Sequence, residues 1–405
     1  MKRWKKLSLL LLVVVLISQI PFAYRRYLLG RLNARIQVLN SERTAATNSN
    51  FAEYKGVTHV HSFLGGHSTG NFSEIISAAQ ANQLQFVIMT EHPAKDFNTA
   101  ELTLKGIHGG VLFVNGNEVG AANGNRLLIM PGDTTPADAE NLTTNEIATK
   151  ANARGSLVVV AYPEQFKDWN TADSIGGYDG VEVYNVYTNA RQINPVIAFL
   201  DTLWSHHSYP DLLFATFYRR PNDALAKWDQ ALTHRRLTAT AGNDSHANIG
   251  ISLNDDSGHT LIGLRLDPYE TSFHLVRLHV LIPKDRGFDT KTLLQAIAAG
   301  HCFIGFDLFT DTTGFSFRAE NPRETRIQGD EITLQKETRL KVSTPVSSRI
   351  VLFKDGDAVL DENGVSSKEF TVTERGVYRV EVYLPELGKP VGEQPWVISN
   401  PIYVR

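Results

Sequence analysis

Short apolar runs that end in a polar or charged residue recur along the first three quarters of the chain. Four of them are VTHVH, QFVIMTEH, GVLFVNGNEVG and LTATAGNDSH, and helix-like segments such as SEIISAAQANQL lie between them. Short β-branched runs that alternate with helical segments are typical of βα units around a parallel sheet. In a parallel α/β barrel the carboxyl ends of the strands form the active-site face. The polar ends of these runs, His61, His92, Glu118 and Asp244, are therefore candidates for one site.

The pattern changes after about residue 312. Segments such as TRLKVSTP, SRIVLFKDGDAVL and KEFTVTERGVYRVEVYLP alternate apolar and polar residues, with Gly and Asp where turns are expected. This alternation predicts short antiparallel strands. We expect an α/β barrel domain over 56–312 and a small all-β, sandwich-like domain over 313–405.

The N-terminus is strongly apolar. Residues 7–24, LSLLLLVVVLISQIPFAY, carry no charge and follow the basic segment MKRWKK. A helix of about 17–25 apolar residues spans a bilayer, whereas a cleaved signal has a shorter run and a small-x-small cleavage site. We favour an uncleaved membrane anchor over a cleaved signal, with a buried helix as a third alternative. We assign 1–35 to the anchor and juxtamembrane segment, and 36–55 to a polar linker.

Basic residues flank this span almost equally. The residues concerned are Lys2, Arg3, Lys5 and Lys6 before it, and Arg25, Arg26, Arg31 and Arg35 after it. The positive-inside rule is therefore nearly balanced. Since a charged N-terminus before a first span usually stays in the cytoplasm, we expect the catalytic region outside the cytoplasm, in the periplasm or the extracellular space.

Composition excludes other classes of protein and of site. With 405 residues and a net charge of −3, the chain suits about two globular domains. Its charge is not concentrated, so we expect no specific nucleic-acid binding. Cys302 is the single cysteine, which excludes an intrachain disulfide and a Cys-based zinc site.

Three histidines lie within nine residues in GVTHVHSFLGGHSTG. On a strand, residues i and i+2 point to the same face, so His59 and His61 are expected to point one way. Asp244 and His246 repeat this spacing. Neutral imidazole and carboxylate are the usual ligands of zinc, manganese and iron in catalytic sites.

One such pair is more often solvent-facing than metal-binding, but two pairs at strand ends are a stronger signal. Glu91, His92 and Glu118 also lie at strand ends. Packed carboxylates and histidines without a common cation would carry a large desolvation cost. Glu91 is a candidate acceptor that orients a histidine, or alternatively a charge in solvent.

The order of these motifs resembles the polymerase and histidinol phosphatase (PHP) family of metal-dependent phosphoesterases. The motifs are H-x-H, a histidine in a Gly/Ser loop, MTEHP, NGNEVG and AGNDSHA, within about residues 56–310. The resemblance implies a distorted (βα)7 barrel. The C-terminal PWVISNPIYVR is similar to a branch of exported metallohydrolases with a β-domain after the PHP domain.

The resemblance also implies two divalent metal ions, Zn, Mn or Fe. It assigns to the first ion His59, His61, Glu118 and Asp244, of which Glu118 can bridge. It assigns to the second ion His67, His92 and His246. Glu118 and Asp244 are the implied catalytic residues.

A further metal in the family is often held by a histidine after the bridging Glu and by a histidine in an HP motif. Asn125 and Tyr162 stand at these positions here, which predicts a two-metal centre. If the other sites have also changed, the domain is a weakened or inactive relative. Our candidate substrate contacts are Asn125, Tyr162 and Arg219 of FYRRPND. The guanidinium of Arg219 is able to clamp a phosphate. An arginine pair such as Arg219 and Arg220 is more commonly a solvated face or an ion-pair partner.

Two metal ions lower the pKa of a shared water and neutralise charge on a phosphoryl or acyl oxygen. No Ser or Cys nucleophile is then required. We therefore expect a membrane-anchored metal-dependent hydrolase that cleaves a small-molecule phosphoester with a metal-bound hydroxide. The alternatives are a carbamate or carboxylic ester hydrolase on the same metals, and a non-catalytic binding scaffold.

Overall fold

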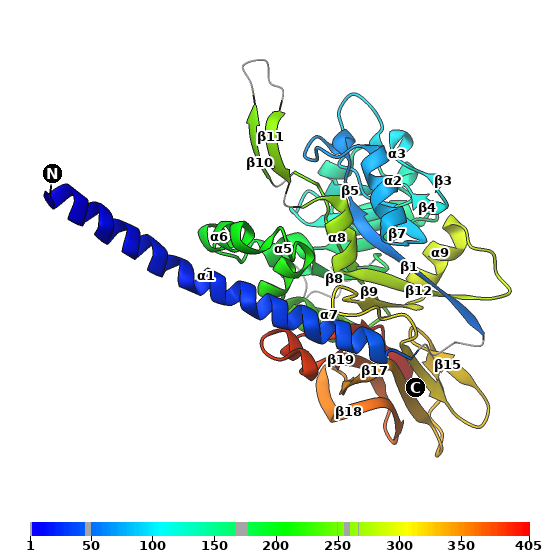
Figure 1. Ribbon diagram of the computed structural model, residues 1–405. Helices are drawn as coiled ribbons and strands as arrows, with labels where there is room; N and C mark the ends of the chain where they lie inside the picture. Colours follow the sequence, from blue (N-terminus) through cyan, green and yellow to red (C-terminus); the bar gives the residue numbers. More distant parts are fainter. Residues whose placement is uncertain (1, 45–49, 167–176, 249, 255–259, 266) are drawn as a thin grey trace.

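The computed structural model describes residues 2–44, 50–166, 177–248, 250–254, 260–265 and 267–405. A long N-terminal helix leads into an α/β body, and a β-rich region follows at the C-terminus (Figure 1). The mixed α/β class expected from the sequence is therefore confirmed.

Two sheets form the body. The first contains, in spatial order, β13 (Cys302–Gly305), β12 (Arg277–Pro283), β1 (Phe51–Val60), β2 (Phe86–Met89) and β4 (Val111–Val114). The second contains β5 (Asn117–Gly120), β6 (Arg126–Met130), β7 (Leu157–Ala161), β8 (Gly180–Asn185) and β9 (Thr238–Gly242). Strands β1, β2 and β4 run parallel, as do β7, β8 and β9, whereas β12, β13, β5 and β6 pair antiparallel.

The two sheets are joined at two seams by isolated bridges. Val60, at the end of β1, bridges Ser245 just after β9, and Glu91, just after β2, bridges Asn117 of β5. No continuous ladder crosses either seam in the described part of the chain, so the structure does not confirm a closed (βα)7 barrel. Both seams lie at the carboxyl ends of β1 and β2.

The C-terminal strands continue the first sheet. Strand β20 (Pro395–Ser399) pairs with β13, and β19 (Gly376–Tyr383) pairs with β20. Strand β17 (Arg339–Lys354) extends the sheet further, since it pairs with β19 and also with β14 (Ser316–Glu320). The C-terminal strands are thus joined edge to edge with the body, and the structure does not confirm a sandwich over 313–405.

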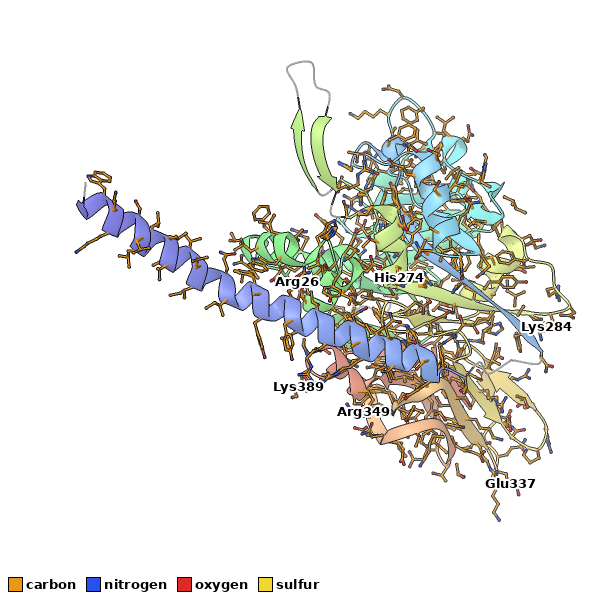
Figure 2. All side chains as sticks on the ribbon, in the orientation of Figure 1. Arg26, His274, Lys284, Glu337, Arg349 and Lys389 are labelled. Atoms are coloured by element: carbon orange, nitrogen blue, oxygen red, sulfur yellow. The ribbon has the colours of Figure 1, made fainter. Side chains whose placement is uncertain are left out.

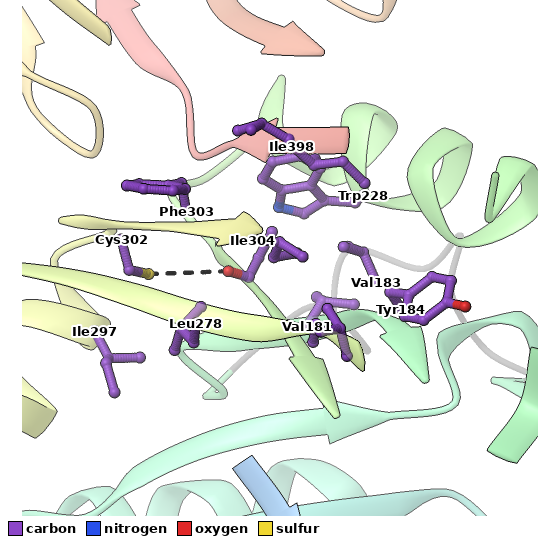
Figure 3. Packing of buried hydrophobic residues seen from close by; sticks show 14 of the residues in the cluster. Val181, Val183, Tyr184, Trp228, Leu278, Ile297, Cys302, Phe303, Ile304 and Ile398 are labelled. Atoms are coloured by element: carbon purple, nitrogen blue, oxygen red, sulfur yellow. Dashed lines mark hydrogen bonds between the residues drawn. The ribbon is translucent and has the colours of Figure 1, made fainter. Parts of the chain in front are cut away.

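Apolar packing also joins the two regions. Figure 3 shows Trp228 of α7 (Asn222–Leu232) beside Ile398 of β20, with Val181 and Leu278 below them. All four side chains are buried in one core cluster. Burying a large apolar side chain contributes about 1.5–3 kcal/mol, so this core stabilises body and C-terminal strands together.

Buried ion pairs cross the same boundary. Arg379 of β19 donates to Asp229 of α7 (Nε to Oδ1, 2.6 Å), and Arg220 donates to Glu381 of β19 (Nη2 to Oε1, 2.6 Å). Arg220 is therefore an ion-pair partner, one of the two common roles that the sequence left open for the Arg219–Arg220 pair.

Helix α1 (Lys2–Glu42) has two different halves. The apolar residues from Leu7 to Ile20 are exposed, and α1 is long and apolar enough to cross a membrane, with a mean hydropathy of 2.3 over its most apolar window. The second half buries a stripe at helical spacing, Leu29, Leu32, Ile36 and Leu39, against the body. It lies beside α6 (Pro195–Ser205) in Figure 1.

The segment 36–55, expected to be a linker, has regular secondary structure over most of its length. Residues 36–42 continue α1, and residues 51–55 begin β1. The apolar stripe of α1 explains the difference, because burial of that stripe extends the helix as far as Glu42.

Candidate metal centre

A bulge at the end of β1 places the first two histidines. His59 has a positive φ of 61°, and the register between β1 and β2 shifts between Val57 and Val60. The rings of His59 and His61 lie 5.1 Å apart between centroids. They share one face as expected, but through a bulge and a strand end rather than through regular alternation.

Left-handed backbone recurs among the neighbours of His59. Tyr162 and Asp244 have φ values of 52° and 48°. A non-glycine residue in this region costs about 1–3 kcal/mol, and such strain clusters at functional sites. The surrounding seams hold it: Ser245 donates its N–H to the carbonyl of His59 at 3.2 Å.

The carboxylate of Glu118, on β5, faces three imidazoles. Its Oε2 lies 3.2 Å from His59 Nε2, 3.5 Å from His61 Nε2 and 3.6 Å from His92 Nε2. Glu118 and His92 adjoin the seam between β2 and β5, while the other two histidines adjoin the seam with β9. The cluster thus lies where both seams meet.

The carboxylate of Asp244 faces the same centre from the opposite seam. Its Oδ1 lies 3.6 Å from His59 Nε2, 3.5 Å from His61 Nε2 and 3.4 Å from His246 Nδ1. Tyr162 donates its hydroxyl to the other oxygen, Oδ2, at 2.8 Å, and Asn185 donates to Oδ2 at 3.3 Å. These two donors fix the carboxylate so that Oδ1 points inward.

Several polar atoms at this centre have no hydrogen-bond partner. Both ring nitrogens of His61 and Oδ1 of Asp244 are buried and unpartnered. Buried polar atoms are rarely left in this state, because their desolvation is then uncompensated. A divalent cation would coordinate Asp244 Oδ1 and one ring nitrogen of His61, so the residues present fit a metal ion.

Two overlapping groups offer ligand atoms within 4.8 Å of one another. They are His59, His61 and Glu118 in one group, and His61, His92 and His246 in the other. His61 belongs to both. His67, expected in the second group, is exposed and lies at the edge, with its ring 5.1 Å from that of His92.

Glu182 is a functional candidate that the sequence reading missed. Its Oε1 lies 2.7 Å from His59 Nδ1, and its Oε2 accepts from Asn185 at 2.9 Å. A carboxylate on the outer nitrogen of a histidine orients the inner nitrogen as a ligand. The available signal was a single acidic residue inside the apolar run GVEVYN.

Two other candidates lie in different surroundings from those expected. Asn125 is buried and donates to Thr144 at 3.1 Å, so its amide is engaged away from the cluster. Arg219 donates to the carbonyl of Tyr218 and lines a separate cavity beside α1. Both placements argue against substrate contact at the histidines.

Glu91 is neither in solvent nor paired with a histidine. It is buried and accepts from the hydroxyls of Ser62 and Thr103 at 2.6 and 2.8 Å. It therefore holds the backbone after β1, where Ser62 also donates its N–H to the same carboxylate.

Burial and charge set the protonation of the cluster. Burial lowers the pKa of His61 and of His92 to about 4, so both are neutral at pH 7. Burial also acts to lower the pKa of His59, but the carboxylates of Glu182 and Asp244 raise it well above its usual value. Burial would raise the pKa of Glu118, yet the neighbouring histidines hold it at about 2. Neutral imidazoles and ionised carboxylates are the forms that bind metals. His61, His92 and Glu118 are therefore in the binding form, whereas His59 would release its proton when an ion binds.

A cavity of about 920 Å³ opens over one side of the cluster. His67, His92 and Glu118 line it, together with the cations Lys95 and Arg126. Arg126 Nη1 lies 4.0 Å from Glu118 Oε1. Neither cation was a sequence candidate, and the lining also contains the acids Asp96, Asp133 and Glu140.

Comparison with known proteins identifies similar structures only. No family model and no curated protein matches the chain. A two-domain protein from Bacteroides vulgatus that contains a predicted PHP-like metal-dependent phosphoesterase is 14% identical, covering 89% of this chain and 98% of its own, with a TM-score of 0.41. PsfC from Pseudomonas syringae is 12% identical over 61% of this chain and 89% of its own, at a TM-score of 0.36.

A third solved structure is a candidate metal-dependent phosphoesterase from Bifidobacterium adolescentis. It is 13% identical over 50% of this chain and 93% of its own, at a TM-score of 0.30. Two of the three names thus match the family that the sequence resembles. With every TM-score below 0.5, the geometry of the cluster carries the functional conclusion instead.

Proposed function

We propose that this chain is a metal-dependent hydrolase with a two-metal centre, acting on phosphoesters. The observation that carries the proposal is the buried, unpartnered state of His61 and of Asp244 Oδ1 opposite Glu118. The proposed ligands of the first ion are His59, His61, Glu118 and Asp244. Those of the second are His67, His92 and His246, with Glu118 able to bridge and His61 within reach of both groups.

Divalent ions at this centre would supply Lewis acidity and an activated water. The chain's own residues prepare the site for them. Glu182 fixes the ring of His59, while Tyr162 and Asn185 fix the carboxylate of Asp244. These contacts hold the ligand atoms in position before a substrate arrives.

Substrate selection follows from the cavity over the cluster. Arg126 lies beside Glu118 at the wall of that cavity, and Lys95 lines the same space. A guanidinium binds phosphate oxygens with two parallel hydrogen bonds. A phosphoester is the substrate class that this cation favours over a neutral carboxylic ester.

The test combines metal content with substrate choice. The full chain in detergent is expected to hold about two equivalents of Zn, Mn or Fe by elemental analysis. It should then hydrolyse an aryl phosphomonoester or phosphodiester faster than an aryl acetate with the same leaving group. His59→Ala combined with His61→Ala should remove both metal and activity, while His234→Ala, at an exposed histidine, should change neither.

Two other outcomes of these measurements would indicate a different function. Metal with faster acetate hydrolysis would replace the phosphoesterase by an ester hydrolase on the same centre. A chain that takes up no metal even from excess would be a binding scaffold.

We also propose that α1 anchors the chain in a membrane, with the body outside the cytoplasm. The exposed residues from Leu7 to Ile20 support the anchor. Among the basic residues after the span, Arg25 bonds to Asp201 and Arg35 to the carbonyl of Leu387. Since these cations have structural partners, the basic N-terminus is the better guide to orientation. A C-terminal alkaline phosphatase fusion, active only outside the cytoplasm, tests this assignment.

A further inference from the structure

A second cavity, of about 650 Å³, lies beside α1 just after its exposed apolar half. Nearly all the charged residues that line it are cations. The cations are Arg25, Arg31, Arg35, Arg219 and Lys389, and the one acid in the lining is Asp201. Arg25 pairs with Asp201 at 2.7 Å, so this acid neutralises none of the other cations.

Three of these arginines have no carboxylate partner among the described residues. Arg35 donates to the carbonyl of Leu387 at 2.6 Å, and Arg219 donates to the carbonyl of Tyr218 at 2.7 Å. Arg31 is exposed, and no ion pair holds it in the described structure. Carbonyl contacts position a guanidinium without cancelling its charge, so the cavity keeps a positive potential.

Apart from Gln192 and Thr216, the remaining lining is mostly apolar. Leu28, Leu32, Ile193, Ile197 and Val391 contribute to the walls between the cations. A cavity that is both cationic and apolar matches a ligand with an anionic group attached to hydrocarbon.

The neighbouring helix α6 presents a further apolar surface. Val196 and Leu203 are 65% and 61% exposed, and Phe199 is also exposed. Trp204 of this helix donates its indole N–H to Gln19 of α1 at 3.0 Å. This contact places the end of α6 level with the last part of the apolar stretch 7–24.

The length of that stretch locates the membrane surface. At 1.5 Å per residue, its 18 residues extend about 27 Å, close to the thickness of a bilayer's hydrocarbon core. Arg25 follows directly and Arg31 lies about 9 Å further along α1, so both reach the level of the lipid headgroups. Figure 2 shows Arg26 between α1 and α6, and Lys389 below α1 on the same side of the molecule.

We propose that this cavity binds the phosphate headgroup of an anionic phospholipid, while α6 lies in the surface of the membrane. The inference rests on the proposed membrane anchor and is independent of the metal centre. Arg31 and Arg219 contact the phosphate, and the exposed side chains of α6 contact the acyl chains. Arg219, expected from the sequence to contact a substrate phosphate, thus contacts a lipid phosphate instead.

The first test measures lipid retention by the full chain. The chain is exchanged in mixed micelles of equimolar phosphatidylglycerol and phosphatidylcholine, and bound lipid is read by native mass spectrometry. We expect phosphatidylglycerol to be retained, and Arg31→Gln with Arg219→Gln to reduce its retention about tenfold. Arg323→Gln, at an exposed arginine of the C-terminal region, should leave retention unchanged.

Equal retention of both lipids, or an unchanged ratio in the double variant, would overturn the site. Retention of added inorganic phosphate in place of lipid would also overturn it, in favour of a free-anion site.

The second test separates this site from the anchor. Single cysteines replace three exposed residues: Leu203 in α6, Leu12 in α1 and Val359 in β18 (Asp357–Thr371). Each cysteine is labelled with a fluorophore, and the chain is placed in vesicles that contain a lipid quencher. Cys302 is buried, so the parent chain serves as the labelling blank. We expect quenching at positions 203 and 12 and none at 359. Quenching at 12 alone would leave the anchor standing and overturn the role of α6, whereas no quenching at 12 would overturn the anchor and this inference with it.

Discussion

Among the described residues, two clusters hold histidine and carboxylate groups close enough to share a cation. One is the centre around His61, and the other groups His279, Asp307 and Asp311 at the junction of β12 with the C-terminal region. Residue type alone does not distinguish them. Their hydrogen bonding does.

In the second cluster the central histidine is fully partnered. His279 Nδ1 lies 2.7 Å from Glu53, and its Nε2 lies 2.9 Å from the hydroxyl of Thr312. Burial acts to lower the pKa of His279, but Asp307 and Glu53 raise it to about 9. Asp307 in turn accepts from Arg277 at 3.2 Å. This is a protonated histidine in an ion-pair network, whereas His61 has a pKa of about 4 and no hydrogen-bond partner among the described residues.

The comparison predicts opposite outcomes for two carboxylate substitutions, and the larger concerns Glu118. Glu118→Gln removes the charge that faces three imidazoles, so we expect kcat/KM to fall by at least about a thousandfold. Metal content should fall below two equivalents, as read by elemental analysis. Wild-type turnover in this variant would exclude Glu118 from the centre.

Asp307→Asn should act on stability instead. It leaves Arg277 and protonated His279 buried without their shared carboxylate, which costs about 3–5 kcal/mol of unfolding free energy. Denaturant unfolding of the full chain in detergent measures this loss, and metal content should stay the same as in the wild type. A loss of metal without a loss of stability would reverse the roles of the two clusters.

The raised pKa of His279 also predicts a pH dependence. A histidine whose pKa is raised on folding contributes stability that is fully present below its unfolded pKa of about 6.5 and is lost as pH rises through about 9. From pH 6 to pH 10 the metal-free chain should lose roughly 3 kcal/mol through this group. In His279→Gln this component should be missing, so the difference between variant and wild type must shrink as pH rises. A difference that is constant across this range would show that His279 is neutral in the folded state.

The strand-end pattern was enough to predict most of the first cluster. His59, His61 and Asp244 lie at or beside the carboxyl end of a strand, as expected. Glu118 is instead the second residue of β5, which follows β4 along the chain. What brings them together is a pair of isolated bridges between two sheets. These bridges join residues that lie far apart in the sequence. The local alternation of strands and helices therefore predicted a parallel barrel but not the two seams.

The remaining errors have different physical causes. The buried stripe of α1, with Leu29, Leu32 and Ile36 at helical spacing, was readable in the sequence as a reason to extend the helix past residue 35. The position of Asn125 was not readable, because its amide turns to Thr144 only through the path of the loop between β5 and β6. A motif position fixes a residue's place along the chain but not the direction of its side chain.

Glu182 gives the smallest of the expected effects and the sharpest check on the comparison. Glu182→Gln keeps the size of the side chain but removes the charge opposite His59 Nδ1, so His59 is less firmly oriented. We expect metal affinity to fall about 10–100-fold, as for other outer-shell partners of metal-bound histidines. A competition titration with a chelator measures this change. Glu53→Gln is the matched control, because it removes the equivalent contact from His279 and should leave metal affinity unchanged while lowering stability. If both variants lowered stability alone, His59 would be an ion-pair histidine like His279, and the unpartnered atoms of His61 would need another explanation.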